Sequence, residues 1–283
     1  MTARARVRSI HRYPVKSMLG EELAEGDFTA SGLAGDRAFA VLGVDGAVGS
    51  AKHPRKWGRL LSCRAESTAT GAARVVLPGG AVLAAGAPEL DQDLSVLLGR
   101  PVVLSDKPPE QGLLERQVPD YDGGLPEALA PSAVTDPTGA SITSGRTAAG
   151  TFFDFGAVHL VTTGTLDRLR RRHPAGDLDP RRFRPNLVID TGNTPGYPED
   201  AWPGARLRIG GALFQVQVPT PRCVVPTLAH GDLPPDPTLM RTVAREHRVP
   251  VLTLGKLTCV GLYLTVLEPG TVRTGDPVTT APR

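Results

Sequence analysis

Short apolar runs separated by turn residues dominate the first hundred positions of the chain. These runs cover residues 7–10, 39–44, 75–77 and 81–83. Each run is bounded by glycine, proline or aspartate, as is typical of short strands. Pro78-Gly79-Gly80 predicts a tight hairpin between the last two runs. Residues 88–98 repeat apolar side chains at helical spacing up to Gly99, and residues 101–104 resume a strand.

The same kind of pattern returns in the second half of the chain. Strands are predicted over residues 158–161, 187–189, 206–209, 213–218, 259–267 and 271–278. Gly210-Gly211 predicts a hairpin turn between the third and fourth of them. One helix is expected to begin with Thr162 or Thr163 as its N-cap and to end near His173-Pro174. Another is expected to open at Asp236-Pro237 and to run to about His247.

Between these halves, residues 105–150 are rich in Pro, Gly, Asp and Thr and show no clear period. A stretch of that length without regular structure is uncommon inside a compact domain. It is therefore interpreted as an irregular linker region that contains a domain boundary. The 283 residues are enough for two domains, each with its own core. We predict domains over residues 1–125 and 126–283.

Composition strengthens the expectation of a strand-rich fold, and the mild net charge argues against a nucleic-acid partner. Gly (32) and Pro (27) are abundant while aromatic residues make up only 5% of the chain, a profile typical of many turns between short strands. The fold class expected is mainly β (α+β) with few short helices. A net charge of +3 is mild, and the basic run at residues 168–172 is interpreted as a solvated helix end. No nucleic-acid partner is expected.

Cysteine content and the distribution of apolar residues predict the compartment. Cys63, Cys223 and Cys259 are too few and too scattered for a disulfide framework, and an odd count favours a reducing compartment. The first residues lack the apolar core of a secretory signal, and no apolar stretch reaches membrane-spanning length. A cytoplasmic protein without membrane contact is expected.

The segment with the clearest chemistry is Pro219-Thr220-Pro221-Arg222-Cys223. Two prolines fix φ just before the cysteine, and Arg222 places a permanent positive charge beside it, which favours thiolate over thiol. A stiff thiolate of this kind suits a nucleophile or a soft metal ligand. Taken alone, a structural cysteine in the core is the commonest role of a free thiol, and Cys63 and Cys259, which lie in apolar surroundings, are assigned that role.

Several distant segments carry groups that bind anions or a polar heterocycle. Lys16, Ser17 and Arg37 all offer donors to phosphate oxygens. Arg184 and Asn186 supply a fork of donors and an amide that both donates and accepts. For each of these the plainer alternative is a surface charge or a side chain bonded to a nearby carbonyl. Asp36 is interpreted as a turn residue or a partner of Arg37.

The order of motifs YPVKS, GLAGDR, RFRPNLVI, PTPRC and LEPGTVRTGDPV resembles that of the MOSC family, which includes the mitochondrial amidoxime-reducing component and its bacterial relatives. The similarity covers nearly the whole chain. It implies a β-barrel-like N-terminal MOSC region packed with a β-barrel MOSC domain. It also implies a molybdenum–molybdopterin cofactor held between the two.

The resemblance also implies roles for individual residues. Matching motifs assign the cofactor to a set of side chains and the metal to one thiolate. The cofactor-binding set is Lys16, Ser17, Arg37, Thr162, Thr163, Arg184, Asn186 and Arg222, and the molybdenum ligand and catalytic residue is Cys223. Thr162 or Thr163 falls where relatives use a helix-start hydroxyl, and a helix N-terminus is a natural anion site. This match is looser than the others. Lys52 stands where relatives often carry a basic residue.

Two functions follow from these assignments. The first is a molybdenum-dependent reductase that removes oxygen from N-hydroxylated small molecules. Because the four-cysteine pattern of a ferredoxin domain is absent from the sequence, its electrons would come from a separate donor protein of ferredoxin or flavin-reductase type. The second is sulfur handling, with a persulfide on Cys223, carbon–sulfur bond chemistry or carriage of the cofactor. No pyridoxal-phosphate desulfurase region accompanies the MOSC motifs.

Overall fold

The computed structural model describes residues 5–68, 70–110, 112–122, 124–125, 127 and 129–281, and strands outnumber helices among them. The mainly β (α+β) class predicted from the sequence is confirmed. The α-helices are α1 (Pro54–Trp57), α2 (Pro88–Leu98), α3 (Thr163–Arg172) and α4 (Leu239–Glu246). The 3₁₀ turns are η1 (Gly58–Ser62), η2 (Ala130–Ser132), η3 (Pro180–Phe183), η4 (Pro198–Ala201) and η5 (Val225–Thr227).

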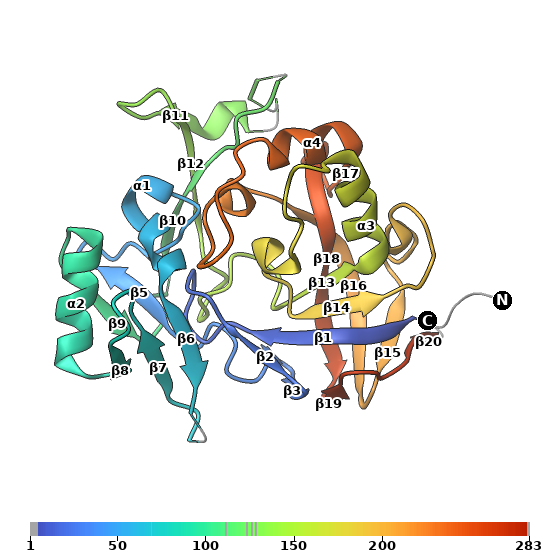
Figure 1. Ribbon diagram of the computed structural model, residues 1–283, viewed down its shortest axis with the longest axis horizontal. Coiled ribbons are helices and arrows are strands. Elements are labelled where there is room, and N and C mark those ends of the chain that lie inside the picture. The colour runs from blue at the N-terminus through green and yellow to red at the C-terminus, as the bar shows by residue number, and fades with distance from the viewer. Residues whose placement is uncertain are drawn as a thin grey trace.

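A nine-stranded sheet forms the larger lobe, on the right in Figure 1. Its strands are β1 (Arg6–Arg12), β2 (Glu21–Leu23), β13 (Val158–Thr162), β14 (Leu187–Asp190), β15 (Arg206–Ile209), β16 (Ala212–Pro221), β17 (Arg248–Pro250), β18 (Lys256–Glu268) and β20 (Val278–Ala281). The order along the sheet is β2-β1-β14-β13-β18-β16-β15-β20, with β17 paired to β18. The sheet curls until β1 meets the segment before β20 at the bridge between Arg6 and Pro277.

One parallel pair in this sheet brings two distant segments to the same edge. Strands β13 and β14 run parallel and are joined by α3, whereas the other pairings of the sheet are antiparallel. Parallel strands need such a crossover, and their starting ends therefore lie together. The backbone N–H of Asn186, just before β14, donates to the carbonyl of His159 on β13 at 2.7 Å.

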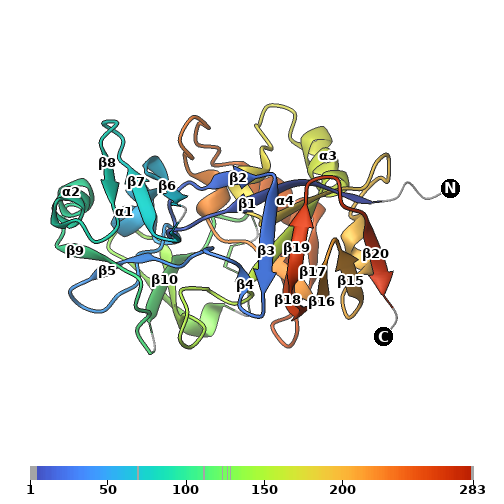
Figure 2. The ribbon, with the colours of Figure 1, turned by 90° about the horizontal axis from the view of Figure 1, so that it is seen from below.

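The start of the chain belongs to the core of the larger lobe. Val7, Ile10 and Phe28 are buried among side chains of the second half. The Phe28 ring meets Phe214 edge-on, with centroids 5.2 Å apart. Strand β3 (Glu25–Thr29) pairs with β19 (Gly270–Arg273) and with β4 (Gly32–Leu33), and Figure 2 shows β3 and β19 side by side. The pairing of β3 with β19 thus joins an N-terminal and a C-terminal segment of the chain.

The smaller lobe is built mainly from residues between Val15 and Ser105 (Figure 1, left). Strands β5 (Ala40–Gly43) and β9 (Val102–Ser105) pair, and β6 (Arg64–Ser67), β7 (Ala73–Val76) and β8 (Val82–Ala84) form a second small sheet. Leu90 and Leu94 of α2 bury their side chains against Trp57 and Leu60. Helix α2 ends at Gly99, whose φ of 65° is left-handed, as its sequence predicted.

The prediction of an irregular linker over residues 105–150 is wrong in part. Strands β10 (Leu113–Gln117), β11 (Ala133–Thr135) and β12 (Ser141–Arg146) form an antiparallel sheet there. The strands were missed because β10 and β12 each bury a single apolar side chain, Leu114 and Ile142, and β11 buries none. The predicted domain boundary at residue 125 falls between β10 and β11 and stays a prediction.

Two predicted elements have different bounds in the structure. Helix α4 begins at Leu239, not at Pro237, because Asp236 Oδ1 accepts hydrogen bonds from the backbone N–H groups of Thr238 and Leu239. The strand predicted over residues 271–278 is two strands, β19 and β20. Asp276 separates them by accepting a hydrogen bond from the backbone N–H of Arg273 at 2.7 Å. The 206–209 and 213–218 hairpin is confirmed as β15 and β16.

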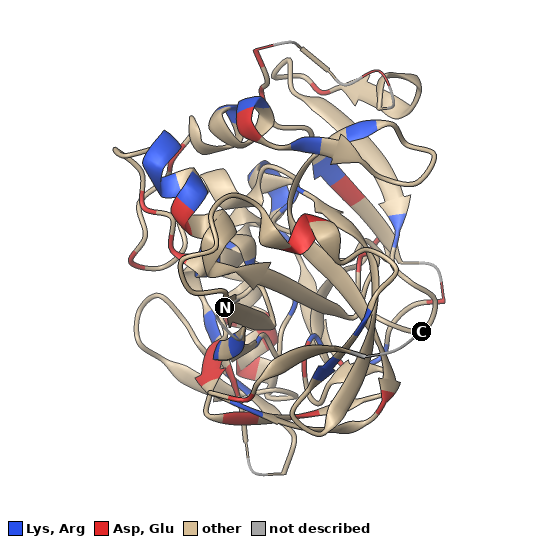
Figure 3. Cartoon of the chain, turned by 90° about the vertical axis from the view of Figure 1, so that its right-hand side faces the viewer, with Lys and Arg blue, Asp and Glu red and all other residues tan. Residues whose placement is uncertain are grey.

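Charged residues of both signs are interspersed on the side of the molecule that carries the chain termini (Figure 3). The basic end of α3 contributes to this pattern by pairing with α4. Arg168 and Arg172 both bind the carboxylate of Glu246, at 2.8 and 3.1 Å. The basic run singled out in the sequence therefore lies at a helix end, as expected, and part of it holds two helices together.

Candidate cofactor and substrate site

Seven of the nine predicted site residues line a single cavity between the two lobes. They are Lys16, Ser17, Arg37, Arg184, Asn186, Arg222 and Cys223. They come from the turn after β1, the turn before β5, the start of β14 and the segment after β16. The fold therefore gathers residues that are up to two hundred positions apart in the chain.

Lys16 and Ser17 enter the cavity from the turn between β1 and β2. The Lys16 ammonium donates to the carbonyl of Phe152 at 2.6 Å and to Asp154 Oδ1 at 2.7 Å. Burial lowers the pKa of Lys16 to about 8, although Asp154 acts in the opposite direction. Ser17 has a left-handed φ of 67°, and its hydroxyl oxygen accepts from the backbone N–H of Ala51 at 2.9 Å. Its hydroxyl hydrogen remains available for an acceptor.

Two guanidinium groups share the ring of Tyr13. The Cζ atom of Arg184 lies 4.2 Å from the ring centroid and that of Arg37 lies 5.0 Å from it. Asp36 pairs with Arg37 and also accepts from the backbone N–H of Tyr13 at 2.7 Å, so it partners Arg37 as expected. Burial and the charge of Arg37 lower the pKa of Arg184 to about 10. Arg184 Nη1 donates to the carbonyl of Met18 at 2.7 Å, while its buried Nη2 has no hydrogen-bond partner.

Asn186 is buried at the start of β14, where its amide joins three strands. Its Oδ1 accepts from the backbone N–H of His159 at 3.1 Å, and its Nδ2 donates to the carbonyl of His11 at 3.2 Å. Asn186 therefore lines the cavity while it fixes β1, β13 and β14 relative to one another. Burial, followed by the charge of Arg222, lowers the pKa of His159 to about 3, so this ring is neutral.

Cys223 follows β16 and differs from the other two cysteines in exposure. It is half-buried and packs against Ala51, Leu61 and Val225. Burial raises the pKa of the Cys63 thiol to about 11 and that of Cys259 to about 12, in keeping with their expected place in the core. Arg222 donates from Nη2 to the carbonyl of Phe183 at 2.8 Å, and its buried Nε has no partner.

Thr162 and Thr163 do not line this cavity, and their hydroxyls are engaged elsewhere. Thr162 is the N-cap of α3, as predicted, and accepts from the backbone N–H of Thr165. It donates to Glu199 Oε2 at 2.6 Å, and Thr165 donates to Glu199 Oε1 at the same distance. Thr163 donates to Asp190 at 3.3 Å. The acceptor at this helix N-terminus is therefore a carboxyl group of the chain itself, that of Glu199.

Matches to two domain families identify the family of the chain. The MOSC N-terminal beta barrel domain matches residues 4–94, and the MOSC domain matches residues 148–279. The chain belongs to the MOSC-domain family. The larger lobe accordingly carries the MOSC domain, to which β1 contributes from the N-terminal domain. No curated protein matches the chain significantly.

Solved structures of low identity resemble this MOSC protein. The YuaD protein from Bacillus subtilis is 12% identical, with a TM-score of 0.45, over 98% of this chain and 94% of that one. YiiM from Geobacillus stearothermophilus is 21% identical, with a TM-score of 0.33, over 45% of this chain and 55% of that one. YiiM from Escherichia coli is 24% identical, with a TM-score of 0.31, over the same shares.

Sequence reasoning missed a carboxylate that lines this cavity. Asp154 lines the cavity and pairs with Lys16 at 2.7 Å and with Lys52 at 2.5 Å. Burial disfavours its charge, but the two lysines outweigh burial and hold the pKa of Asp154 well below its usual range. The available signal was a lone acid in the apolar run Phe152-Phe153-Asp154-Phe155. Lys52, which the resemblance mentioned only loosely, belongs to the site through this pair.

Within the part of the chain that the structure describes, no helix is both long and apolar enough to cross a membrane.

Proposed function

We propose that the cavity around Cys223 holds a molybdenum–molybdopterin cofactor and that the protein reduces N-hydroxylated small molecules. The proposal is supported first by membership of the MOSC family. It is supported next by the chemistry of the cavity wall, where cationic donors from both lobes converge beside a half-buried thiol. The single observation that carries it is the pair of guanidinium groups on the ring of Tyr13.

The residues present fit an anionic, phosphorylated group. Arg37 and Arg184 bring two like charges onto one ring, and Asp36 compensates only one of them. The buried Nη2 of Arg184 has no hydrogen-bond partner in the protein. Buried donors without a partner are costly, and an anion that accepts from them removes the cost. A pterin phosphate supplies such acceptors.

Each side chain has a role in this proposal that follows from its contacts. Arg184, Arg37 and the Ser17 hydroxyl would hold the phosphate and the pterin, and the sulfur of Cys223 would bind the molybdenum as a soft ligand. When bound, the cofactor supplies the two-electron chemistry that removes oxygen from a substrate. Thr162 and Thr163 have no part in it, because their hydroxyls serve Glu199 and Asp190.

The net reaction breaks one nitrogen–oxygen bond. An N-hydroxy compound, two electrons and two protons give the corresponding N–H compound (an amidine from an amidoxime) and one water. We propose that the electrons come from a separate donor protein of ferredoxin or flavin-reductase type. Lys16 and Lys52 both form ion pairs with Asp154 at the cavity. The lowered pKa of Lys16, about 8, makes its Nζ proton easier to release than that of an ordinary lysine.

Metal analysis of the purified protein tests this function. We expect near-stoichiometric molybdenum and pterin phosphate, both lost in Cys223→Ala and retained in the control Cys63→Ala. Chemically reduced protein should convert benzamidoxime to benzamidine, and Cys223→Ala should abolish that conversion. Protein that carries labile sulfur on Cys223 and no molybdenum would instead identify the sulfur-handling function. Molybdenum without turnover of any N-hydroxy compound would refute the reductase while leaving cofactor binding in place.

A further inference from the structure

A second cavity adjoins the first and reaches the same cysteine. Its volume is about 260 Å³. Six residues line both cavities: Lys52, Asp154, Pro221, Arg222, Cys223 and Tyr263. A molecule in the second cavity therefore lies next to Cys223 and to the acid–lysine pair without entering the part of the first cavity that is lined by Arg37 and Arg184.

Apolar side chains form most of the wall and the rim of this second cavity. Val118, Val251 and Leu257 are buried in the wall. Phe155, Leu252 and Leu254 also line it, yet their exposed fractions are 55%, 65% and 46%. Large apolar side chains are rarely left exposed together at one opening of a soluble protein without a ligand or partner to cover them. The rim therefore suits a ligand with an apolar body.

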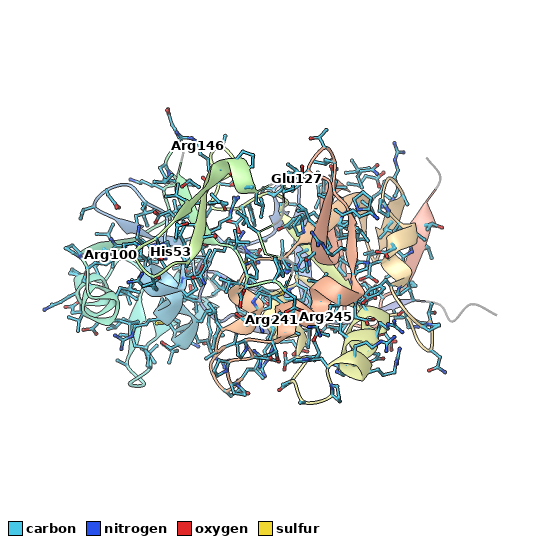
Figure 4. All side chains as sticks on the ribbon, turned by 90° about the horizontal axis from the view of Figure 1, so that it is seen from above. His53, Arg100, Glu127, Arg146, Arg241 and Arg245 are labelled. Atoms are coloured by element: carbon cyan, nitrogen blue, oxygen red, sulfur yellow. The ribbon has the colours of Figure 1, made fainter. Side chains whose placement is uncertain are left out.

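Two segments of the chain border the opening of this cavity. One is the hairpin turn between β17 and β18, which carries Leu252 and Leu254. The other is the stretch after β10, which carries Tyr121. The two acids that flank Tyr121, Asp120 and Asp122, pair with Arg241 and Arg245 of α4, and Figure 4 shows these two arginines next to each other. The wall that contains Tyr121 is thus anchored to α4.

The charged groups of this cavity are mainly basic. Lys52, Arg116 and Arg222 line it together with a single acid, Asp154. Asp154 is already compensated by Lys16 and Lys52. The Nε atoms of Arg116 and Arg222 are both buried and have no hydrogen-bond partner. Two buried, unpartnered guanidinium donors favour a ligand group that accepts hydrogen bonds and disfavour a cation.

We propose that the second cavity binds the apolar body of the substrate and that Arg116 and Arg222 select a reacting group that is neutral or anionic. The favoured class is N-oxygenated compounds with an aromatic or branched aliphatic body, such as aryl hydroxamic acids and aromatic N-oxides. N-hydroxyguanidines, which are cationic near neutral pH, are disfavoured. The reaction itself rests on the proposed function, whereas the binding preference rests on the cavity alone.

Binding of three unreactive probes to the full chain tests the preference by calorimetry. The probes are 2-naphthoate, 2-naphthamidine of the same shape but opposite charge, and acetate, which lacks the apolar body. We expect 2-naphthoate to bind at least about tenfold more tightly than 2-naphthamidine, since one charge-assisted hydrogen bond is worth roughly that factor. Acetate should bind much more weakly than 2-naphthoate. Equal affinity for the two naphthyl probes would overturn the proposal.

Three variants identify the groups responsible. Arg116→Gln should weaken 2-naphthoate about tenfold and leave 2-naphthamidine unchanged or tighter, whereas the control Arg74→Gln, at an exposed pair with Glu66, should change neither. Leu252 has a left-handed φ of 48°, which asparagine adopts more readily. Leu252→Asn should therefore fold well and weaken both naphthyl probes by a similar factor. Unchanged binding of 2-naphthoate in Arg116→Gln would refute the selection.

The outcomes separate this inference from the proposed function. Protein that lacks molybdenum but prefers 2-naphthoate, with the effects above, would retain the pocket and reject the reductase. Protein that holds molybdenum and reduces benzamidoxime, yet turns over an aryl hydroxamic acid and an aryl N-hydroxyguanidine with equal kcat/KM, would retain the reductase and reject the selection. Competition of 2-naphthoate with the reducible substrate is expected where both proposals hold.

Discussion

Arg184 and Arg37 lie on the same aromatic ring, that of Tyr13, with Cζ-to-centroid distances of 4.2 and 5.0 Å. Each arginine has a left-handed backbone, with φ of 54° and 49°, and the carbonyl of Arg184 accepts from Arg37 Nη2 at 3.3 Å. Tyr13 itself is buried, and its hydroxyl has no partner. The ring therefore acts as a platform that keeps two cations close together at the cavity.

This platform predicts a difference between two substitutions of Tyr13. Tyr13→Phe keeps the ring and removes an unpartnered hydroxyl, so the free energy of unfolding should stay level or rise slightly. Tyr13→Leu removes both cation–π contacts and should lower the free energy of unfolding by about 1–3 kcal/mol. Under the proposed function it should also lose molybdenum. Urea denaturation and metal analysis of the two variants provide the measurement, and equal behaviour of both would contradict the platform.

The pair of Lys16 and Asp154 predicts an unusual lysine titration. Burial lowers the pKa of Lys16 to about 8, and Asp154 opposes that shift. In Asp154→Asn the opposition is lost, so the lysine should release its proton at a still lower pH. Side-chain NMR of labelled lysines should show one amine titrating near pH 8 in the native chain and earlier in Asp154→Asn. The surface variant Asp106→Asn should leave that titration unchanged.

The same titration has a consequence for anion binding. Since Lys16 loses its charge as the pH rises through about 8, anions held in the first cavity should bind more weakly above that pH. This weakening can be measured as the amount of pterin phosphate that the protein retains during dialysis at several pH values. In Asp154→Asn the loss should begin at lower pH. A retention curve that is flat from pH 7 to pH 9.5 in both proteins would show that Lys16 does not contribute.

The sequence predicted those parts of the fold that depend on local signals. Helix α2 has exactly its predicted extent because its apolar spacing and Gly99 act within the helix. The hairpin of β15 and β16 depends on neighbouring glycines in the same way. The sheet of β10, β11 and β12 was missed because Arg116 and Gly145, for example, interrupt the alternation of apolar residues in strands of three to six residues.

The site residues follow the same rule: those in local motifs were predicted, and those that depend on distant partners were not. Motif order placed Lys16, Arg184 and Cys223 in one cavity, because each motif stays intact in the sequence. Asp154 was missed because its partner Lys16 is 138 positions away, and no local pattern marks such a pair. Thr162 was assigned to the cofactor because it falls where MOSC relatives use a helix-start hydroxyl, at a helix N-terminus that attracts anions. The carboxyl group that accepts from its hydroxyl, that of Glu199, lies 37 positions further along and was not foreseeable from the helix itself.

Glu199 predicts a fall in stability with rising pH. Burial raises the pKa of Glu199 above its ordinary value of 4.5. Between 4.5 and the raised pKa, the folded state holds a proton that the unfolded chain has lost, so the free energy of unfolding decreases as the pH rises through that window. Glu199→Gln should flatten this dependence, and the exposed Glu110→Gln should not. Urea titrations between about pH 4.5 and pH 7.5 compare the slopes.

The last prediction separates helix capping from cofactor binding. In Thr162→Val the first turn of α3 loses the cap on the backbone N–H of Thr165, and Glu199 loses one of its two hydroxyl donors. The free energy of unfolding should fall by about 1–2 kcal/mol. Because Thr162 lies outside the cavity, molybdenum and pterin phosphate should remain in the folded protein. Arg184→Met should instead lose molybdenum and pterin phosphate, since it removes a guanidinium whose Nη2 has no other partner. Loss of the cofactor from well-folded Thr162→Val would return this helix N-terminus to the cofactor site.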